Sequence, residues 1–516
     1  MRRWGSLALV AALGAAACGG SDTNSGGETD VAFGQTDGTL AETAETDAPV
    51  ETEADSEPDD EAPVDTESPP DTEASDDGEP AQLPETDGPA ADGVLAVPEE
   101  FDTIQAAVDA ASAGDLVLIS PGTYHEAVDV TTDEIVIRGL EREGVVLDGE
   151  FELDNGIRVL GATGVAVENL TAQNYTTNGV FFVSSTGYRA SYVSAYRNGD
   201  YGIYAFDSVQ GQIEHSYGAG SPDAGFYIGQ CFPCDANVVD VLSEHNGLGY
   251  SGTNAGGNLV IANSTFRNNR AGIVPNSGSY ELCYPQRQNL IVGNTVHSNN
   301  QPDTPAIDVA LLAMGNGILA PGGIANTIER NLVYGHARTG IGLVPFLEEG
   351  PNDDVPDQSE WTVTCDEQRE QPLAADIPDT LLWDAYDNIV RDNVVLDSGE
   401  ADLGVAGVDA LTGSLRNCWS GNDSSTSRPA DLQSIAPCDG DVAAADGGAW
   451  DVDPLDVFAW LAAVDSQPPA VDYQVAELPP LPDLDDMPDA ATAPAQPATD
   501  VPFPLDTDAI TVPEMP

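Results

Sequence analysis

Two markers of a repeat meet in the stretch NLVIANSTFRNNRAGIVPN, residues 258–276. One is the glycine of Ala271-Gly272-Ile273, and the other is the pair of asparagines five residues apart, Asn258 and Asn263. Equivalent glycines recur every 23 or 24 residues, as Gly179, Gly202, Gly225, Gly249 and Gly272, and again as Gly317 and Gly340. Asparagine pairs recur as Asn289/Asn294, Asn326/Asn331 and Asn388/Asn393. Two markers in step predict a structural repeat of 23 residues.

Short β-type runs within such a repeat fit few solenoids. The leucine ladder of leucine-rich repeats is absent, and the helical repeats are longer and poor in glycine. A parallel β-helix remains, with about three short strands per turn and a rise of about 4.8 Å between turns. Glycine at a corner permits a positive φ, and asparagine at a turn can bond to its copies in adjacent turns. We therefore interpret these glycines and asparagines as structural.

The start of this region predicts a cap for the solenoid. In FDTIQAAVDAASAGDLVLISPGTY, residues 101–124, Asp102 and Gln105 have the spacing of a capping box. The apolar residues that follow lie on one helical face, namely Ile104, Ala107, Val108 and Ala111. A short amphipathic helix followed by a strand would seal the open end.

This segment, together with PGTYHE at 121–126, resembles the start of the right-handed parallel β-helix (pectin-lyase-like) proteins. The Gly-Ile and Gly-Val repeats downstream resemble the β-helix repeat of that superfamily, so the resemblance covers 94–425. It implies an all-β fold, a right-handed parallel β-helix solenoid with an N-terminal capping helix, which we place at 94–438. These motifs identify the fold, but they do not indicate which reaction the protein catalyses.

Alternation along the strands predicts an aromatic ladder. If Ile203 faces the core, then Phe181, Tyr204 and Tyr227 point outward on successive coils. Exported proteins of the resembled superfamily commonly bind polysaccharide along such a face, whereas the alternative is a ladder that only stiffens the sheet. The predicted substrate-binding residues are Phe181, Tyr204, Asp207, Tyr227 and Gln230.

Polar residues near this ladder are candidates for catalytic groups that act on a polysaccharide. A uronate lyase or C5-epimerase needs a base (His215 or His245), a cation (Arg267 or Arg270) and an acid (Tyr227 or Tyr250). A glycoside hydrolase would need two carboxylates from Asp200, Asp207 and Asp223, although each is also typical turn chemistry. The catalytic candidates are thus His215, His245, Tyr250, Arg267, Arg270 and Asp223. Characteristic pectinesterase and polygalacturonase segments are absent, and the lack of lysine excludes lyases that use a lysine base.

The net charge of the chain limits the classes of partner that it can bind. The 88 acidic residues face 16 basic residues, all of them arginine, and the net charge is −72. This balance argues against nucleic acid and against a basic patch for anionic membranes. It would also repel a uronate chain unless Ca²⁺ formed a bridge. Asp353, Asp354 and Asp357, in the insert at 345–387, could bind Ca²⁺ or form a solvated acidic loop. We predict no other metal or cofactor.

The first twenty residues, MRRWGSLALVAALGAAACGG, predict an export signal at 1–18. Ala15-Ala16-Ala17-Cys18 resembles a bacterial lipobox, although leucine is usual where Ala15 stands. This resemblance implies a lipid on Cys18, which would anchor the protein to the cell envelope, at the outer membrane or cell surface. The alternative is an ordinary secretory signal. Residues 19–93 are acidic and poor in aromatics, which predicts a disordered linker.

An even number of cysteines remains for disulfides in an exported chain, namely Cys231, Cys234, Cys283, Cys365, Cys418 and Cys438. For Cys231-Phe-Pro-Cys234 we favour a small staple over a redox or zinc site. Residues 439–516 form a Pro- and Asp-rich tail, in which 453–464 predict one short helix covering the C-terminal end of the solenoid.

The sequence thus predicts a monomeric envelope lipoprotein whose β-helix binds an extracellular polysaccharide and processes it by lyase or epimerase action. A non-catalytic surface adhesion or glycan-binding module is the alternative, and a glycoside hydrolase comes third.

Overall fold

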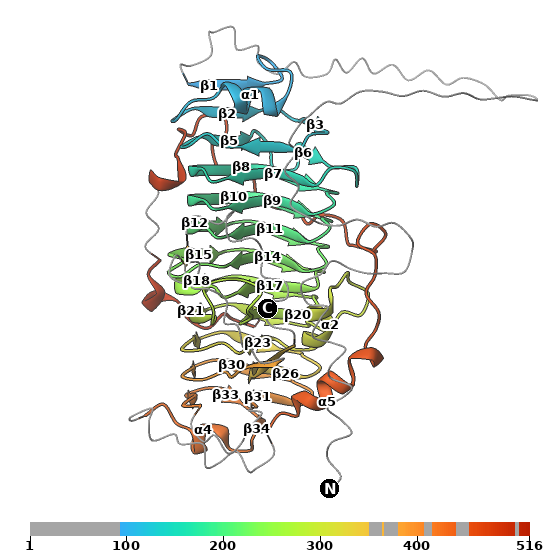
Figure 1. Ribbon diagram of the computed structural model, residues 1–516, viewed down its shortest axis with the longest axis vertical. Coiled ribbons are helices and arrows are strands. Elements are labelled where there is room, and N and C mark those ends of the chain that lie inside the picture. The colour runs from blue at the N-terminus through green and yellow to red at the C-terminus, as the bar shows by residue number, and fades with distance from the viewer. Residues whose placement is uncertain are drawn as a thin grey trace, which may run out of the picture. The chain divides into compact units, whose positions relative to one another are not determined.

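The computed structural model describes residues 93–349, 364–365, 380–406, 415–439, 454–500 and 505–515. In this part the chain winds into a right-handed parallel β-helix, as predicted, whose coils stack along one axis (Figure 1). Most coils add two strands to sheet A and one strand to sheet B.

Sheet A has 21 strands in the described part of the chain. They are β1 (Val94–Val97), β2 (Leu116–Ile119), β3 (Gly122–Tyr124), β5 (Val136–Gly139), β6 (Val145–Asp148), β8 (Thr163–Gln173), β10 (Thr186–Tyr196), β12 (Val209–Glu214), β13 (Tyr217–Ala219), β15 (Ala236–Val239), β16 (Leu242–Glu244), β18 (Gly256–Ala262), β19 (Thr265–Arg267), β21 (Arg287–Val292), β22 (Thr295–His297), β24 (Thr327–Glu329), β25 (Leu332–Tyr334), β29 (Ile389–Arg391), β30 (Val394–Leu396), β32 (Cys418–Ser420) and β33 (Asp423–Ser424).

Sheet B has 11 strands in the same described ranges. They are β4 (Val128–Val130), β7 (Asn155–Leu160), β9 (Asn178–Val183), β11 (Tyr201–Phe206), β14 (Ala224–Gly229), β17 (Leu248–Thr253), β20 (Ala271–Asn276), β23 (Ile318–Pro321), β26 (Thr339–Val344), β31 (Ala401–Val405) and β34 (Ser427–Arg428). A separate antiparallel pair joins β27 (Phe346–Glu349) to β28 (Thr380–Trp383). The helices are α1 (Ile104–Ala110), α2 (Asp308–Ala313), α4 (Leu432–Ile435) and α5 (Val457–Ala462), with 3-10 turns η4 (Val464–Ser466), η5 (Ala498–Asp500) and η6 (Thr507–Ala509).

The repeated glycines mark the coils, but for a different reason from the one predicted. None of them has a positive φ. They are required by close approach, because a Cβ on Gly202 would lie 2.4 Å from the carbonyl oxygen of Gly225 on the next coil. The residue after each glycine points inward, so that Ile203, Phe226 and Tyr250 stack in register in the core, all without exposed surface.

The asparagines divide into two roles. Asn294, Asn331 and Asn393 form a buried ladder, in which the Asn294 side chain donates to Asn331 Oδ1 at 3.0 Å and the Asn331 side chain donates to Asn393 Oδ1 at 2.9 Å. Asn258 and Asn263 are instead exposed, with left-handed φ values of 55° and 50°. Leu259 pairs with Asn289, so the pair 258/263 lies one residue out of register with the later pairs. Its grouping with them was wrong.

Helix α1 caps the first coils, as predicted, and buries Ile104, Ala107 and Val108. The predicted capping box is wrong, because the N-cap is Thr103, whose hydroxyl accepts from Ala106 N at 3.1 Å. The Glu126 carboxylate accepts the next free N–H groups, from Ile104 at 3.0 Å and Gln105 at 3.1 Å. The Glu126 carboxylate, which lies after the helix in the chain, therefore caps the first N–H groups of α1 in place of the predicted capping box.

The C-terminal segment packs against the coils beyond α5 (Figure 1). We call residues 464–500 and 505–515 the C-terminal strap. Six arginines of the coils donate hydrogen bonds to main-chain carbonyl groups of this strap: Arg138, Arg142, Arg189, Arg197, Arg270 and Arg330. Helix α5 lies within the predicted range 453–464. The residues after it were predicted to form a tail, but they pack against the coils and accept hydrogen bonds from them.

Candidate functional site

The predicted aromatic ladder exists on the outer side of sheet B. Phe181, Tyr204 and Tyr227 lie in register on β9, β11 and β14. The Phe181 and Tyr204 rings stack at 4.6 Å with an angle of 9°, whereas the Tyr204 and Tyr227 rings meet at 70°. Tyr201 also stacks on Tyr204, at 4.4 Å. Since these rings cover one another's faces, Tyr204 does not present an open face for sugar stacking.

The ladder is partly covered by the loop between β20 and β21. Leu282 of this loop packs against Phe181 and Tyr204, and Glu281 accepts a hydrogen bond from the Tyr227 hydroxyl. Phe181 is therefore only 5% exposed and Tyr227 only 2% exposed, so the prediction that both face solvent was wrong. The Tyr204 and Tyr201 side chains remain half-buried and form the accessible side.

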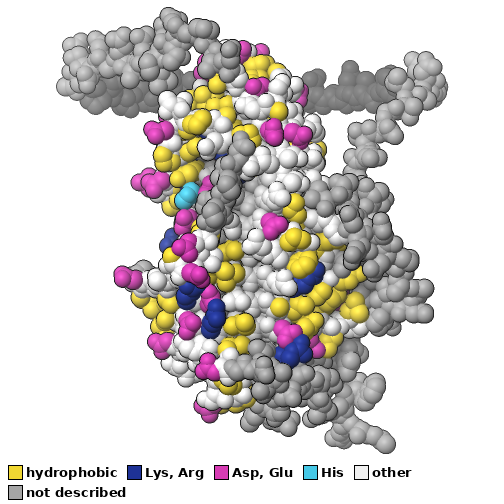
Figure 2. Space-filling view, turned by 90° about the vertical axis from the view of Figure 1, so that its left-hand side faces the viewer, with side chains coloured by type: hydrophobic (Ala, Val, Ile, Leu, Met, Phe, Trp, Pro, Cys, Tyr) yellow, Lys and Arg dark blue, Asp and Glu magenta, His cyan; other side chains and the backbone are white. Residues whose placement is uncertain are grey.

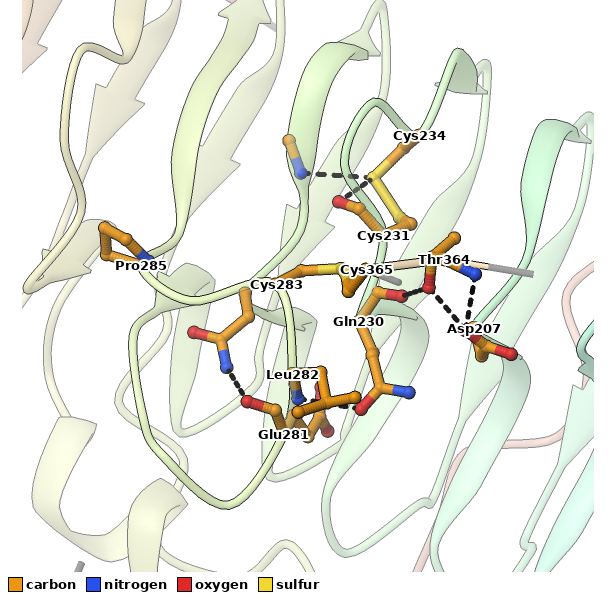
Figure 3. Close-up of a disulfide and its surroundings, with 12 residues drawn as sticks. Asp207, Gln230, Cys231, Cys234, Glu281, Leu282, Cys283, Pro285, Thr364 and Cys365 are labelled. Carbon is orange, nitrogen blue, oxygen red and sulfur yellow. Dashed lines mark hydrogen bonds between the residues drawn. A yellow bond between two sulfur atoms is a disulfide. The ribbon is translucent and has the colours of Figure 1, made fainter. Parts of the chain in front are cut away.

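Two predicted substrate-binding residues hold this cover in place (Figure 3). The Asp207 carboxylate accepts from Thr364 N at 3.0 Å, and Gln230 Oε1 accepts from Leu282 N at 2.8 Å. A disulfide joins Cys283 of the loop to Cys365. Asp207 and Gln230 thus connect sheet B to the cover, next to the aromatic ladder.

Burial raises the pKa of the Tyr204 hydroxyl well above its usual value, and the negative charges of three carboxyl groups raise it further: Glu281, Asp223 and Asp200. Burial raises the pKa of Asp200 to about 6, of Asp223 to about 7 and of Glu281 to about 8. Asp223 Oδ2 accepts from the Tyr201 hydroxyl at 2.6 Å. Within the described residues, Asp223 Oδ1, Glu281 Oε2 and Gln230 Nε2 are buried without a hydrogen-bond partner. Such unpaired groups with pKa values near neutrality are typical of ligand and acid–base sites.

These pKa values predict a pH dependence of stability. Glu281 ionises near its ordinary pKa of 4.5 in the unfolded chain and near 8 in the folded protein. Its stabilising contribution is therefore fully present below about pH 4.5 and is lost as pH rises to about 8. We expect the free energy of unfolding, measured with urea, to fall less steeply over this range in Glu281→Gln. The exposed control Asp240→Asn should keep the wild-type slope, and equal slopes in both variants would contradict the burial of Glu281.

The other predicted catalytic residues lie away from the ladder. Tyr250 follows Gly249 and therefore occupies the inward position of Ile203, with no exposed surface. Arg270 is fully buried and donates to the carbonyl groups of Pro302, Thr304, Pro468 and Pro469.

The remaining three predicted residues belong to the sheet A side. His215 stacks on Tyr192 at 4.8 Å, and Arg267 Nε donates to Glu244 Oε2 at 2.7 Å beside His245. Arg267 lies in register with His297. The structure therefore brings together the aromatic, Asp223, Asp207 and Gln230 candidates, but not the arginines and histidines.

Sequence reasoning missed Tyr201 and Glu281. Tyr201 could have been found, because it precedes Gly202 in the repeated frame and starts the same strand as Tyr204. For Glu281 the only signal was spacing, since Gly272 and Gly317 are 45 residues apart rather than 23, which marks inserted loops.

All six cysteines form disulfides, as predicted: Cys231–Cys234, Cys283–Cys365 and Cys418–Cys438. In the described ranges, no three His, Cys, Asp or Glu side chains are placed to hold a metal ion. Nor does that part of the chain contain a helix that is long and apolar enough to span a membrane. Cys18, the rest of the N-terminal 92 residues, and the Asp353, Asp354 and Asp357 candidates for Ca²⁺ lie outside the described residues.

Part of the β-helix matches a known protein family. Residues 155–345 match the family described as right handed beta helix region. No curated protein sequence is significantly similar to the chain. Similar solved structures include the A-module of a mannuronan C-5 epimerase from Azotobacter vinelandii, with 15% identity, a TM-score of 0.42, and coverage of 62% of this chain and 89% of that one. A rhamnogalacturonan lyase has 12% identity, a TM-score of 0.40, and coverage of 58% and 78%. The described part of the chain is a right-handed parallel β-helix, and residues 155–345 of it match the family of that description.

Proposed function

We propose that the outer side of sheet B around Tyr204 binds an extracellular polysaccharide. The observation that carries this proposal is the convergence of tyrosine hydroxyl groups and carboxyl groups with unpartnered oxygen atoms, at Tyr201, Tyr204, Asp223 and Glu281. Sugar hydroxyls both donate and accept hydrogen bonds, so they match carboxyl oxygens and phenolic hydroxyls. The half-buried Tyr201 and Tyr204 provide the approach to this cluster.

Acid–base processing of the bound glycan is the second candidate, and the pKa values favour it. With pKa values of about 7 for Asp223 and about 8 for Glu281, protonated and ionised carboxyl groups coexist near neutral pH. A protonated carboxyl can give its proton to a glycosidic oxygen while an ionised one removes a proton from water or from a sugar carbon. Protonation of the glycosidic oxygen together with activation of water is hydrolysis, and the same protonation together with removal of the C5 proton of a uronic acid unit is lyase action. An epimerase breaks no glycosidic bond and instead returns a proton to C5 from the opposite face.

The setting that we propose is the cell envelope. A lipid on Cys18 would anchor a monomeric protein, and the acidic linker at 19–93 would hold the β-helix away from the membrane. The test is radiolabelled fatty acid incorporation, which should be lost in Cys18→Ala. Incorporation that persists in this variant would contradict the anchor.

Glycan binding is tested with the full-length protein on a panel of immobilised neutral and uronic polysaccharides. Tyr204→Phe should weaken retention about tenfold, because it removes one hydroxyl group that contacts the ligand. Tyr334→Phe is the matched control, since Tyr334 is also half-buried but lies on β25 of sheet A. Equal retention of Tyr204→Phe and the control would contradict the site, and no retention on any glycan would contradict the function.

Processing is tested on the same panel by scoring unsaturated or shortened products. Asp223→Asn should abolish any product while leaving retention within about threefold, because the amide keeps the shape of the side chain but cannot exchange a proton. Retention without product in the wild type would leave a binding module, the non-catalytic alternative.

A further inference from the structure

The site around Tyr204 is unusual because its carboxyl groups have no cationic partner. Asp223 and Glu281 are both 9% exposed, and the hydrogen bonds that they accept from side chains come from the neutral hydroxyls of Tyr201 and Tyr227. Asp223 and Asp200 repel one another, and so do Asp223 and Glu281. Among the described residues, no arginine or histidine forms an ion pair with any of the three carboxyl groups.

The arginines nearest in the fold are engaged elsewhere. Arg158, one coil before Phe181 in the same outward column, pairs with Asp129 at 2.9 Å. Arg287, at the end of the covering loop, donates to the carbonyl groups of Cys283 and Pro285, both at 2.7 Å. Arg270 is held by the C-terminal strap. On a different side of the molecule, shown in Figure 2, arginine side chains also lie next to acidic ones.

The insert that carries Thr364 and Cys365 is rich in acidic residues. Residues 350–379 contain nine acidic residues and a single base, Arg369, and this insert reaches the site at Thr364 and Cys365.

This arrangement discriminates between classes of sugar. Above about pH 8, where both Asp223 and Glu281 are ionised, the carboxylate of a uronic acid unit would lie against like charges in a poorly hydrated site, with no cation to neutralise it. A neutral unit has only hydroxyl groups, which can donate to Asp223 Oδ1 and Glu281 Oε2 and accept from Gln230 Nε2, the atoms that lack partners. We propose that the site around Tyr204 selects neutral, hydroxyl-rich sugar units and rejects uronic acid units. This selectivity rests on the proposed function of polysaccharide binding. Of the processing reactions proposed above it is compatible with hydrolysis alone, because a lyase or an epimerase removes a C5 proton that only the carboxyl group of a uronic acid unit makes acidic.

Matched ligands test this selectivity without changing linkage or chain length. Polygalacturonate, alginate and hyaluronan are each compared with their carboxyl-reduced forms, and neutral galactan, mannan and dextran complete the panel. Affinity electrophoresis of the full-length protein in the presence of a chelator gives the dissociation constants. In any pair that binds, the reduced form should bind at least about tenfold more tightly, since 1.4 kcal/mol corresponds to a factor of ten.

The outcomes separate the two proposals. Tighter or equal binding of a uronic form would overturn the selectivity but keep the polysaccharide function. Uronate binding that appears only with added Ca²⁺ would also overturn it, because a bridging cation would then supply the missing charge. Failure of every glycan to bind would remove the function itself.

Isosteric variants assign the selectivity to the named carboxyl groups. The double variant Asp223→Asn/Glu281→Gln removes their ionisation and should narrow the preference for reduced over uronic forms by about tenfold. The control Asp240→Asn removes an exposed carboxylate on the sheet A side and should leave the preference unchanged. An unaltered preference in the double variant would show that other groups exclude uronates.

Discussion

Replacement of Arg270 by alanine is expected to lower the free energy of unfolding by about 3–5 kcal/mol. The guanidinium group has no exposed surface and donates to four main-chain carbonyl groups, two on the loop before α2 (Pro302 and Thr304) and two on the C-terminal strap (Pro468 and Pro469). The proline nitrogens nearby carry no hydrogen atoms, so local N–H groups cannot replace the lost donors. Four buried carbonyls would remain unpaired, next to a cavity.

Urea denaturation measures the loss, and hydrogen exchange over residues 464–475 measures release of the strap. Arg416→Ala is the control, because its ion pair with Asp387 is at the surface, with 40% and 31% exposure, and should contribute less than about 1 kcal/mol. Arg270→Lys should recover only part of the loss, since an ammonium lacks the planar fork of donors. A stable Arg270→Ala variant that lost glycan processing would instead favour the catalytic role predicted from the sequence.

Asn331→Ala is expected to destabilise the β-helix by about 3–4 kcal/mol. The buried Asn331 side chain donates to Asn393 Oδ1 and to the carbonyl groups of Ile291 and Glu329, each at 2.9 or 3.0 Å. Its Oδ1 accepts two further bonds from Asn294, at 3.0 Å. Truncation leaves groups of three successive coils unsatisfied, in a place that water cannot reach.

The same substitution at Asn263 is the matched control. Asn263 is exposed and has a φ of 50°, so alanine there should cost only about 1–2 kcal/mol through the left-handed backbone. Thermal and urea unfolding of both variants provide the comparison. Equal destabilisation at the two positions would contradict the division of the asparagines into ladder and turn residues.

Much of the fold could be predicted because each coil of a solenoid repeats the same pattern of inward and outward side chains. The position after each repeated glycine is inward, so Ile203 and Phe226 were correctly assigned to the core, and Tyr204 and Tyr227 to the outer side. The same rule, applied to Gly249, would have placed Tyr250 in the core as well. The six cysteines were correctly predicted to form disulfides, but their pairing followed only from the path of the loops.

The candidate site was predicted in part. The sequence alone determined the coil, its inward and outward faces and the outward aromatic column, because these features depend on local alternation that each turn repeats. Only the tertiary structure decided that Glu281 covers Tyr227, that Asp223 lacks a cation and that Arg270 binds the strap rather than a ligand. The partners in these contacts are 54 residues apart for Tyr227 and Glu281 and 198 for Arg270 and Pro468. Such pairings arise from the paths of non-repeating segments across the coils, and no periodicity in the sequence encodes those paths.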